Sequence, residues 1–250
     1  MSYFGSTDFY LEVAKGTVAG HVAVNIAGHD DAIPTTLATV GEQHGNLYTY
    51  SATANIDTIS SDNAADTHDI TIVGLDINFA VVTQTVTLNG TTPVTLGTSL
   101  YRVNFMYNDI LTTLTPTTGT IYLWVSGGGD TGGVPTVTAD IRAEINLVSG
   151  VSSEHHTTSV YTVPAGHTAY IVFGKVTVTD TKALEMTFWG GRGQTVMQVA
   201  HHIDIKDTNY DYFFKLPLKV AATTDLEVRS SVDSGTAEVS VHYDIILVAD

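Results

Sequence analysis

The segment His68–Val103 alternates apolar or β-branched side chains with threonines, and this alternation restricts the fold more than any other feature of the chain. Residues 70–73, 85–88 and 94–96 follow a period of two, which places successive side chains on opposite faces of a strand. We therefore expect three strands joined by turns. Asn89-Gly90 tolerates the positive φ angles of a tight hairpin turn, and Pro93, which lacks an N–H group, belongs to a longer loop or an edge strand.

The same alternation recurs to the end of the chain. Its clearest later examples are the apolar run Ile121–Val125, the hairpin around Pro164-Ala165-Gly166 and the last strand, Glu238–Val248. Short strands at intervals of roughly 8–12 residues, with turn-forming residues between them, are typical of sandwiches and jelly rolls. The sequence therefore predicts an all-β protein made of two β-sandwich or jelly-roll domains.

The N-terminal residues are expected to form an arm. Phe9, Leu11 and Val13 alternate with polar or aromatic neighbours, which predicts either a first strand or a docking element within Ser2–Val13. A helical turn is expected only near Thr36–Val40.

A polar run, Ser149–Thr158, interrupts the strand pattern near the middle of the chain. We expect a domain boundary there, since a chain of 250 residues is long enough for two sandwiches. Residues 1–150 would hold the N-terminal arm and one β-sandwich domain. Residues 151–250 would hold a C-terminal, jelly-roll-like β-sandwich domain.

Charge and composition exclude several classes of function. The formal net charge of −16 argues against nucleic acid as a partner, because phosphate binding needs a basic surface. Cysteine is absent, so neither disulfides nor thiolate chemistry are expected. No run approaches the roughly 18 apolar residues of a membrane span, and MSYFGSTDFY lacks the features of a secretory signal. The expected stability comes from sheet hydrogen bonds and burial, helped by association of copies.

Histidine and aspartate offer one candidate metal site. His202 and Asp204 are two residues apart on an expected strand and therefore share a face, whereas the adjacent pairs His155-His156 and His201-His202 point to opposite faces. Zinc and iron need three or four converging ligands, and only two are local here. The alternative interpretation is a polar face in contact with solvent.

An acidic loop offers a second candidate. Asp62, Asp66 and Asp69 lie in the run DNAADTHD, and calcium prefers several oxygen ligands. The run lacks the regular spacing and central glycine of an EF-hand, so a loop rich in Asx turns is the structural alternative. No cofactor and no catalytic residue is predicted, and we do not expect an enzyme.

Two pairs of unusual residues are assigned to structure rather than to binding. Arg192 and Arg229 are rare cations in an acidic chain, and we expect structural ion pairs, with an inter-subunit contact as the alternative. Trp124 and Trp189 sit in apolar strands and are expected in the core rather than on a carbohydrate platform.

Several phrases resemble a family of virion structural proteins from tailed marine bacteriophages, commonly short-tailed ones. They are spread over nearly the whole chain: AKGTVAGHVAVNIAG (Ala14–Gly28), SSDNAADT with ITIVGLDINFAVVTQTVTLNGTTPV (Ser60–Val94), YTVPAGHTAYI (Tyr161–Ile171), and LPLKVAATTDLEVRSS with VSVHYDIILV (Leu216–Val248). The middle, Phe105–Thr118 and the GGGDTGGVP loop, departs from the family.

The resemblance implies a non-enzymatic coat, decoration or fibre component at the surface of a phage particle, made in the host cytoplasm. Its expected partners are copies of itself, most simply in a trimer, and the major capsid protein or other virion proteins. Two alternatives stay open: a major capsid protein with two jelly rolls, and a module that adheres to host-surface glycans or depends on calcium.

Overall fold

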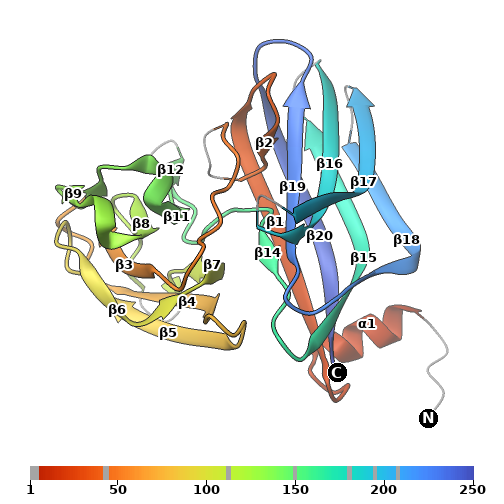
Figure 1. Ribbon diagram of the computed structural model, residues 1–250, viewed down its shortest axis with the longest axis horizontal. Helices are drawn as coiled ribbons and strands as arrows, with labels where there is room; N and C mark the ends of the chain where they lie inside the picture. Colours follow the sequence, from red (N-terminus) through yellow and green to blue (C-terminus); the bar gives the residue numbers. More distant parts are fainter. Residues whose placement is uncertain are drawn as a thin grey trace.

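The protein, described here from a computed structural model of residues 6–41, 45–110, 114–148, 151–178, 182–193, 196–206 and 209–250, has an all-β sandwich fold. Figure 1 shows two groups of strands, each surrounding its own apolar core. We name these the small core, built from residues 56–145, and the large core, built from residues 24–40 and 161–247. In the described part of the chain, no helix has the length and apolar character needed to cross a membrane.

Two antiparallel sheets enclose the large core. Sheet I has the strand order β1-β20-β15-β18, and sheet II has the order β14-β19-β16-β17, with β2 paired to β19. The bounds in sheet I are β1 (His21–Ile33), β15 (His167–Val178), β18 (Asn209–Val220) and β20 (Ala237–Ala249). Those in sheet II are β2 (Ala38–Thr39), β14 (Tyr161–Thr162), β16 (Ala183–Arg192), β17 (Val196–Lys206) and β19 (Asp225–Val232).

Two smaller sheets enclose the small core. Sheet III has the order β11-β8-β3-β6, and sheet IV has the order β5-β4-β7. Their strands are β3 (Ile56–Ser61), β4 (Asp69–Leu75), β5 (Val81–Thr87), β6 (Val94–Leu100), β7 (Arg102–Tyr107), β8 (Ile121–Trp124) and β11 (Ile141–Ile145). The short pairs β9 (Asp130–Thr131) with β10 (Val134–Pro135) and β12 (Leu147–Val148) with β13 (Val151–Ser152), and the 3₁₀ turns η1 (Ser126–Gly128) and η2 (Thr138–Asp140), complete the connections.

The organising segment forms the expected strands, but they pair differently from a simple meander. Gly90 has a φ of +57°, and the Thr92 N–H donates to the Asn89 carbonyl, so the expected turn is present. The strands on either side of it do not pair with each other, because β5 joins β4 and β6 joins β3. The prediction of a hairpin at Asn89-Gly90 is therefore wrong. The hairpin lies one turn earlier, where Asp76 Oδ1 accepts the backbone N–H groups of Asn78 and Ala80.

The N-terminal segment is helical rather than extended. Helix α1 (Ser6–Ala14) replaces the strand predicted from Phe9, Leu11 and Val13. The same spacing contains an i, i+4 pair, Phe9 and Val13, which a helix places on one face. Val13 is buried, whereas Leu11 is half exposed on another side. The helical turn expected near Thr36–Val40 is also wrong, since that segment contains β2.

The two cores do not divide the chain into residues 1–150 and 151–250. Strand β1 pairs with β20 along nearly its whole length, and Val24, Ile26 and Val40 belong to the large core. The chain therefore forms the first strands of the large core, then the whole small core, and then the remaining strands of the large core. A sequence pattern could not reveal this order, because the partner of β1 lies more than 200 residues away.

A glycine pair tests how closely β1 packs. A side chain at Gly28 would collide with the Val40 carbonyl and would lie 2.6 Å from the Ser159 nitrogen, whereas one at Gly174 on β15 would meet no atom within 4 Å. We expect Gly28→Ala to lower the free energy of unfolding by about 1–3 kcal/mol through overpacking. Gly174→Ala should leave it unchanged or raise it slightly, because glycine weakens a strand. Urea unfolding of both variants measures the difference, and equal effects would contradict the described packing.

Candidate functional site

The first predicted metal pair forms a small polar cluster on the exposed edge strand β17. His202 Nε2 lies 3.3 Å from Asp204 Oδ1, and His202 Nδ1 lies 3.8 Å from Glu185 Oε1 on β16. Side-chain exposures are 46% for His202 and 80% for Asp204. The two predicted residues do meet, together with a glutamate that sequence spacing could not identify. Within the described ranges, no group of three or more histidine, aspartate or glutamate side chains is arranged to hold a metal ion.

The acidic loop is organised around one buried carboxylate. Asp66 accepts hydrogen bonds from Ser61 Oγ (2.6 Å), the Thr118 N–H (2.8 Å) and hydroxyl (2.6 Å), and the Gly119 N–H (2.9 Å). Asp62 and Asp69 are exposed; Asp62 accepts the Thr120 N–H at 2.9 Å, and Asp69 accepts the Thr87 hydroxyl. Because Asp66 already has four donors, the loop fits the structural alternative and not a calcium site formed by all three aspartates.

Burial alone would raise the pKa of Asp66, but the hydrogen bonds from Ser61, Thr118 and Gly119 outweigh it and lower the pKa below its ordinary value of 3.8. The carboxylate therefore stays charged at neutral pH and ties the 62–69 loop to the segment before β8.

The most extensive buried polar arrangement lies where the two cores meet. Arg102 on β7 donates to both oxygens of Asp225 on β19, from Nε at 2.8 Å and from Nη2 at 3.0 Å. The side chains of Arg102 and Asp225 are 3% and 0% exposed. Asp225 also accepts the Thr162 hydroxyl at 2.7 Å and the Gly193 N–H at 2.7 Å. Every lone-pair direction of this carboxylate thus has a donor from the protein.

Asn104 reinforces the same contact between the cores. Its side chain donates to the Thr162 carbonyl and accepts the Thr162 N–H, both at 2.9 Å. The amide therefore bonds to β14 as a neighbouring strand would. Arg102 Nη1 also donates to the Ser51 carbonyl at 2.9 Å. We name the six residues that meet here the inter-core joint: Ser51, Arg102, Asn104, Thr162, Gly193 and Asp225.

Aromatic rings enclose the guanidinium of the joint. Arg102 Cζ lies 4.1 Å from the ring centroid of Tyr101, 5.0 Å from that of Tyr50 and 5.9 Å from that of Phe79. Burial opposes the charge, but the hydrogen bonds and negative charge of Asp225 raise the pKa of Arg102 above its ordinary value. Arg102 therefore stays protonated, and its environment orients it as a fixed cation rather than as a proton donor.

Beyond the joint, strand β19 carries two more buried charged residues, Glu227 and Arg229. Glu227 accepts hydrogen bonds from the Thr39 hydroxyl, from Tyr50 Oη at 3.2 Å and from Arg229 Nη2 at 2.9 Å. Burial, followed by the charge of Glu227, raises the pKa of Tyr50 well above its ordinary value. These groups hold one another in place, and the arrangement is that of a structural network.

The two rare cations differ in their surroundings, and so do the two tryptophans. Arg229 has the expected ion pair with Glu227, and its Cζ lies 4.8 Å from the Trp189 ring centroid. Arg192 is exposed; it donates to Thr223 and lies over Phe79. Trp124 is buried in the small core region and donates to Ser60 Oγ at 3.0 Å, whereas Trp189 is only half buried.

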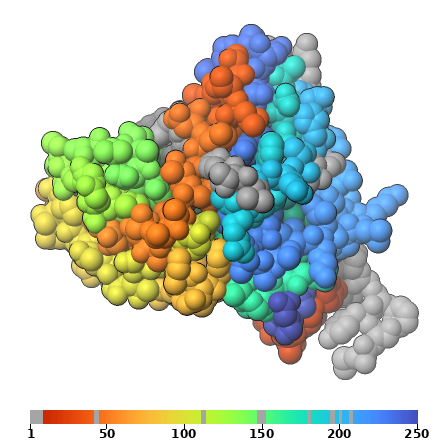
Figure 2. All heavy atoms as spheres, viewed as in Figure 1, coloured from red at the N-terminus to blue at the C-terminus, as the bar shows by residue number. Residues whose placement is uncertain are grey.

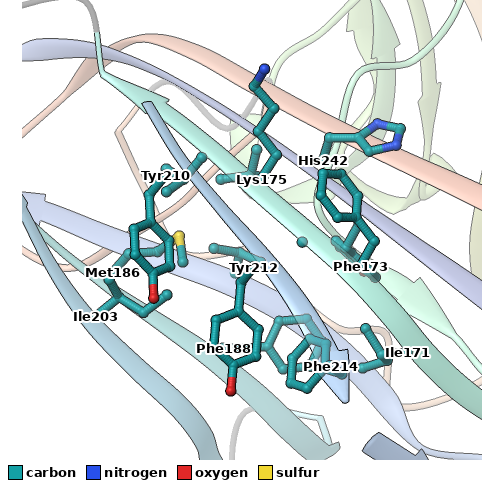
Figure 3. Close-up of a pocket in the computed structure, with 15 residues that line it drawn as sticks. Ile171, Phe173, Lys175, Met186, Phe188, Ile203, Tyr210, Tyr212, Phe214 and His242 are labelled. Carbon is teal, nitrogen blue, oxygen red and sulfur yellow. The ribbon is translucent and has the colours of Figure 1, made fainter. Parts of the chain in front are cut away.

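A cavity of about 40 Å³ lies between sheets I and II on the side away from the small core (Figure 3). It is too small for a drug-sized ligand. Its walls are nearly all apolar, and the inward-facing aromatic residues of β18 close it: Tyr210, Tyr212 and Phe214. A wider groove of about 450 Å³ lies on the outer face of sheet I, between α1 and the exposed Phe213.

No family model and no curated protein matches this chain. Among solved structures, the chain is similar to one titled "Structure of infectious bursal disease virus Gx strain". The two share 11% identity over 92% of this chain and 75% of that chain, with a TM-score of 0.19. A likeness at that TM-score carries no argument about fold or function.

Breaking the joint from one side should be strongly destabilising. Arg102→Met leaves the carboxylate of Asp225 buried without its cation, and we expect a loss of about 3–5 kcal/mol in the free energy of unfolding. The double variant Arg102→Met with Asp225→Asn should lose less than the sum of the two single variants, because neither charge is then left alone. Urea unfolding of the four proteins gives the coupling energy, and additive losses would contradict the pairing.

Removing the charge of Asp66 should change the acid dependence of stability. At pH 7 we expect Asp66→Asn to cost about 1–3 kcal/mol, because an amide N–H₂ would face hydrogen-bond donors. The pKa of Asp66 is lower in the folded state than its ordinary value of 3.8, so the carboxylate stabilises the fold at pH values above 3.8. This stabilisation is lost as the pH falls through the lowered pKa. The difference in the free energy of unfolding between wild type and Asp66→Asn should therefore be constant from pH 7 to about 4 and become smaller below that pH.

The control for this titration is Asp69→Asn, which removes an exposed carboxylate from the same loop. Thermal unfolding at pH 7 should show a smaller loss of stability for Asp69→Asn than for Asp66→Asn, because the carboxylate it removes is exposed. A stability difference between wild type and Asp66→Asn that increases in acid would contradict the stabilising role of the hydrogen-bonded carboxylate.

Proposed function

We propose that the chain is a structural component of a phage particle that works by assembling with copies of itself and with other particle proteins. The sequence resemblance to virion proteins of tailed marine phages supports this proposal. So does a structural observation: large apolar side chains are exposed on the two edge strands that face away from the small core. These are Val199 on β17, 53% exposed, and Phe213 and Leu216 on β18, 73% and 86% exposed.

Exposed apolar side chains on open sheet edges are uncommon on monomers, because such edges pair with other chains. Figure 2 shows blue atoms of the β18 region projecting from this side of the molecule. In a particle, association would cover them. The inter-core joint supports the same role, since a fixed orientation of the two cores lets one subunit make repeated and identical contacts.

The proposed place of the protein is the particle surface, as a decoration or cement protein that forms a homo-oligomer, with a trimer as the simplest form. A double jelly-roll capsid protein is the structural alternative, and the number of copies per particle distinguishes them. A calcium-dependent adhesion role has less support, because Asp66 is occupied by donors from the protein.

The N-terminal segment is the proposed docking element, and its removal tests the function. Helix α1 lies on the outer face of sheet I and contributes Tyr10, Val13 and Ala14 to a groove rather than to either core. We expect the protein lacking Met1–Val13 to fold, as measured by circular dichroism and thermal unfolding, and to be missing from purified particles. Normal occupancy of the truncated protein on particles, counted by quantitative mass spectrometry, would overturn the docking role.

A further inference from the structure

Helix α1 leaves a groove of about 450 Å³ open on the outer face of sheet I. Most of its lining is apolar. Tyr10, Val13 and Ala14 contribute from the helix, and Val172 and Phe213 are among the residues that contribute from the sheet. We name this space the α1 groove. A concave, mostly apolar site that also contains a few polar groups is typical of a ligand-binding site.

The strand register places one row of side chains across the floor of the α1 groove. Asn25 on β1 pairs with Asp244 on β20. Phe173 on β15 pairs with Asp244 on one side and with Phe213 on β18 on the other. All four residues line the groove. The row therefore changes from polar to aromatic across the sheet, in steps of about 4.8 Å, which is the distance between neighbouring strands.

The polar end of this row presents hydrogen-bond acceptors. Asp244 Oδ1 accepts a hydrogen bond from Asn25 Nδ2 at 2.6 Å and lies 2.7 Å from His242 Nε2. Among the described residues, no donor contacts the other carboxylate oxygen, Asp244 Oδ2, or the amide oxygen, Asn25 Oδ1. Because a hydrogen bond already joins the two groups, these two oxygens are neighbours. The side chain of Asp244 is 31% exposed, so a ligand in the groove can reach the carboxylate.

The aromatic end of the row presents ring surface. The centroids of Phe173 and Phe213 are 4.7 Å apart, and the two rings are inclined at 45°. Phe213 is 73% exposed. Aromatic rings attract cations to their faces. Since Phe173 is the direct neighbour of Asp244 in the row, a cation that pairs with the carboxylate lies about one strand spacing from a ring.

This combination of groups fits an arginine side chain. A guanidinium donates to two acceptors at once and also stacks on aromatic rings. The aliphatic stem of an arginine packs along apolar surface while its charged head reaches a polar group. The charge of the whole chain acts in the same direction, because 10 basic and 26 acidic residues attract a cation and repel an anion. A neutral ligand would leave the charge of Asp244 unpaired.

We propose that the α1 groove binds an arginine side chain, flanked by apolar residues, of the particle protein onto which this chain docks. The guanidinium donates to Asp244 Oδ2 and Asn25 Oδ1 and lies beside Phe173, and an apolar neighbour of the arginine packs against Phe213. The inference deepens the proposed docking role of the N-terminal segment and rests on that role for the source of the arginine. In this arrangement α1 acts as one wall of the binding site.

Two short peptides test the site on the full chain. The probe is acetyl-Leu-Arg-Leu-amide, and the matched control is acetyl-Leu-Gln-Leu-amide, which keeps a long polar side chain without the charge. In a nuclear magnetic resonance titration, we expect the arginine peptide to shift the backbone amide signals of Asn25, Phe173 and Asp244. Its affinity should exceed that of the glutamine peptide about tenfold or more. Equal affinities, or shifts confined to residues outside the groove, would overturn the proposal.

Asp244→Asn tests the carboxylate. We expect this variant to lose about tenfold or more in affinity for the arginine peptide and to bind the glutamine peptide as wild type does. Asp211→Asn is the matched control, because it removes an exposed carboxylate from β18 outside the groove and changes the net charge equally. The control should bind both peptides like wild type. An equal loss in Asp211→Asn would show that net charge alone attracts the peptide, and it would overturn the proposal.

Phe213→Ala keeps the test decisive if Asp244→Asn does not fold, as judged by circular dichroism. The ring is mostly exposed, so its removal leaves both cores intact. We expect weaker binding of the arginine peptide, because the apolar neighbour of the arginine loses its contact. Unchanged affinity would overturn the proposed placement of the peptide.

Choline chloride tests a different occupant, since aromatic rings beside a carboxylate also bind small quaternary ammonium compounds. The proposal requires the arginine peptide to bind more tightly than choline. Tighter binding of choline at the same amides would overturn the arginine assignment.

The inference and the proposed function can fail separately. If the arginine peptide binds in the groove but the full chain is absent from purified particles, the site stands and the particle function falls. If the chain and its Asp244→Asn variant both occupy particles at normal copy number and the peptide does not bind, the inference alone falls.

Discussion

The ion pair between Arg102 and Asp225 determines how the two halves of this molecule meet. Both side chains are buried, and the bidentate geometry uses both carboxylate oxygens. A buried pair adds little net stability over an apolar contact of the same volume, because removing two charges from water is costly. Its contribution is directional: a guanidinium and a carboxylate satisfy each other in few orientations, and Asn104 adds a second directional contact to Thr162. The relative position of the two cores is therefore fixed by hydrogen bonds rather than by apolar fit alone.

Strand β19 makes this possible because its two faces differ in chemistry and are both buried. Leu226 and Val228 face the large core, while Asp225, Glu227 and Arg229 face the segment around β2 and the joint. A strand with a charged face is ordinarily a strand with one face in water. Here the partners of that face arrive from residues 39, 50 and 102, so the charges are satisfied by protein groups and not by solvent.

The sequence could predict features that depend on neighbouring residues, but not those that depend on residues far apart in the chain. Period-two alternation depends only on neighbouring residues, so the strands of the 68–103 segment and the all-β class could be predicted from it. Pairing depends on distant residues: the turn at Asn89-Gly90 forms, yet its flanking strands join different sheets. Arg102 carried no local signal at all, because its carboxylate lies 123 positions away. Likewise, Asp66 lies in a polar run typical of an exposed loop, and its burial depends on Ser61 and on Thr118, which is 52 positions away.

The distribution of charge connects these internal features with association. A chain with 10 basic and 26 acidic residues repels its own copies, and in physiological salt only charges within about 8 Å of one another, the Debye length, still interact appreciably. Arg102, Arg142 and Arg229 are buried and cannot help between subunits. Lys215 and Lys219 are exposed on β18, next to large apolar side chains. Any contact between copies would therefore need an exposed lysine of one copy within the screening distance of a carboxylate of the other.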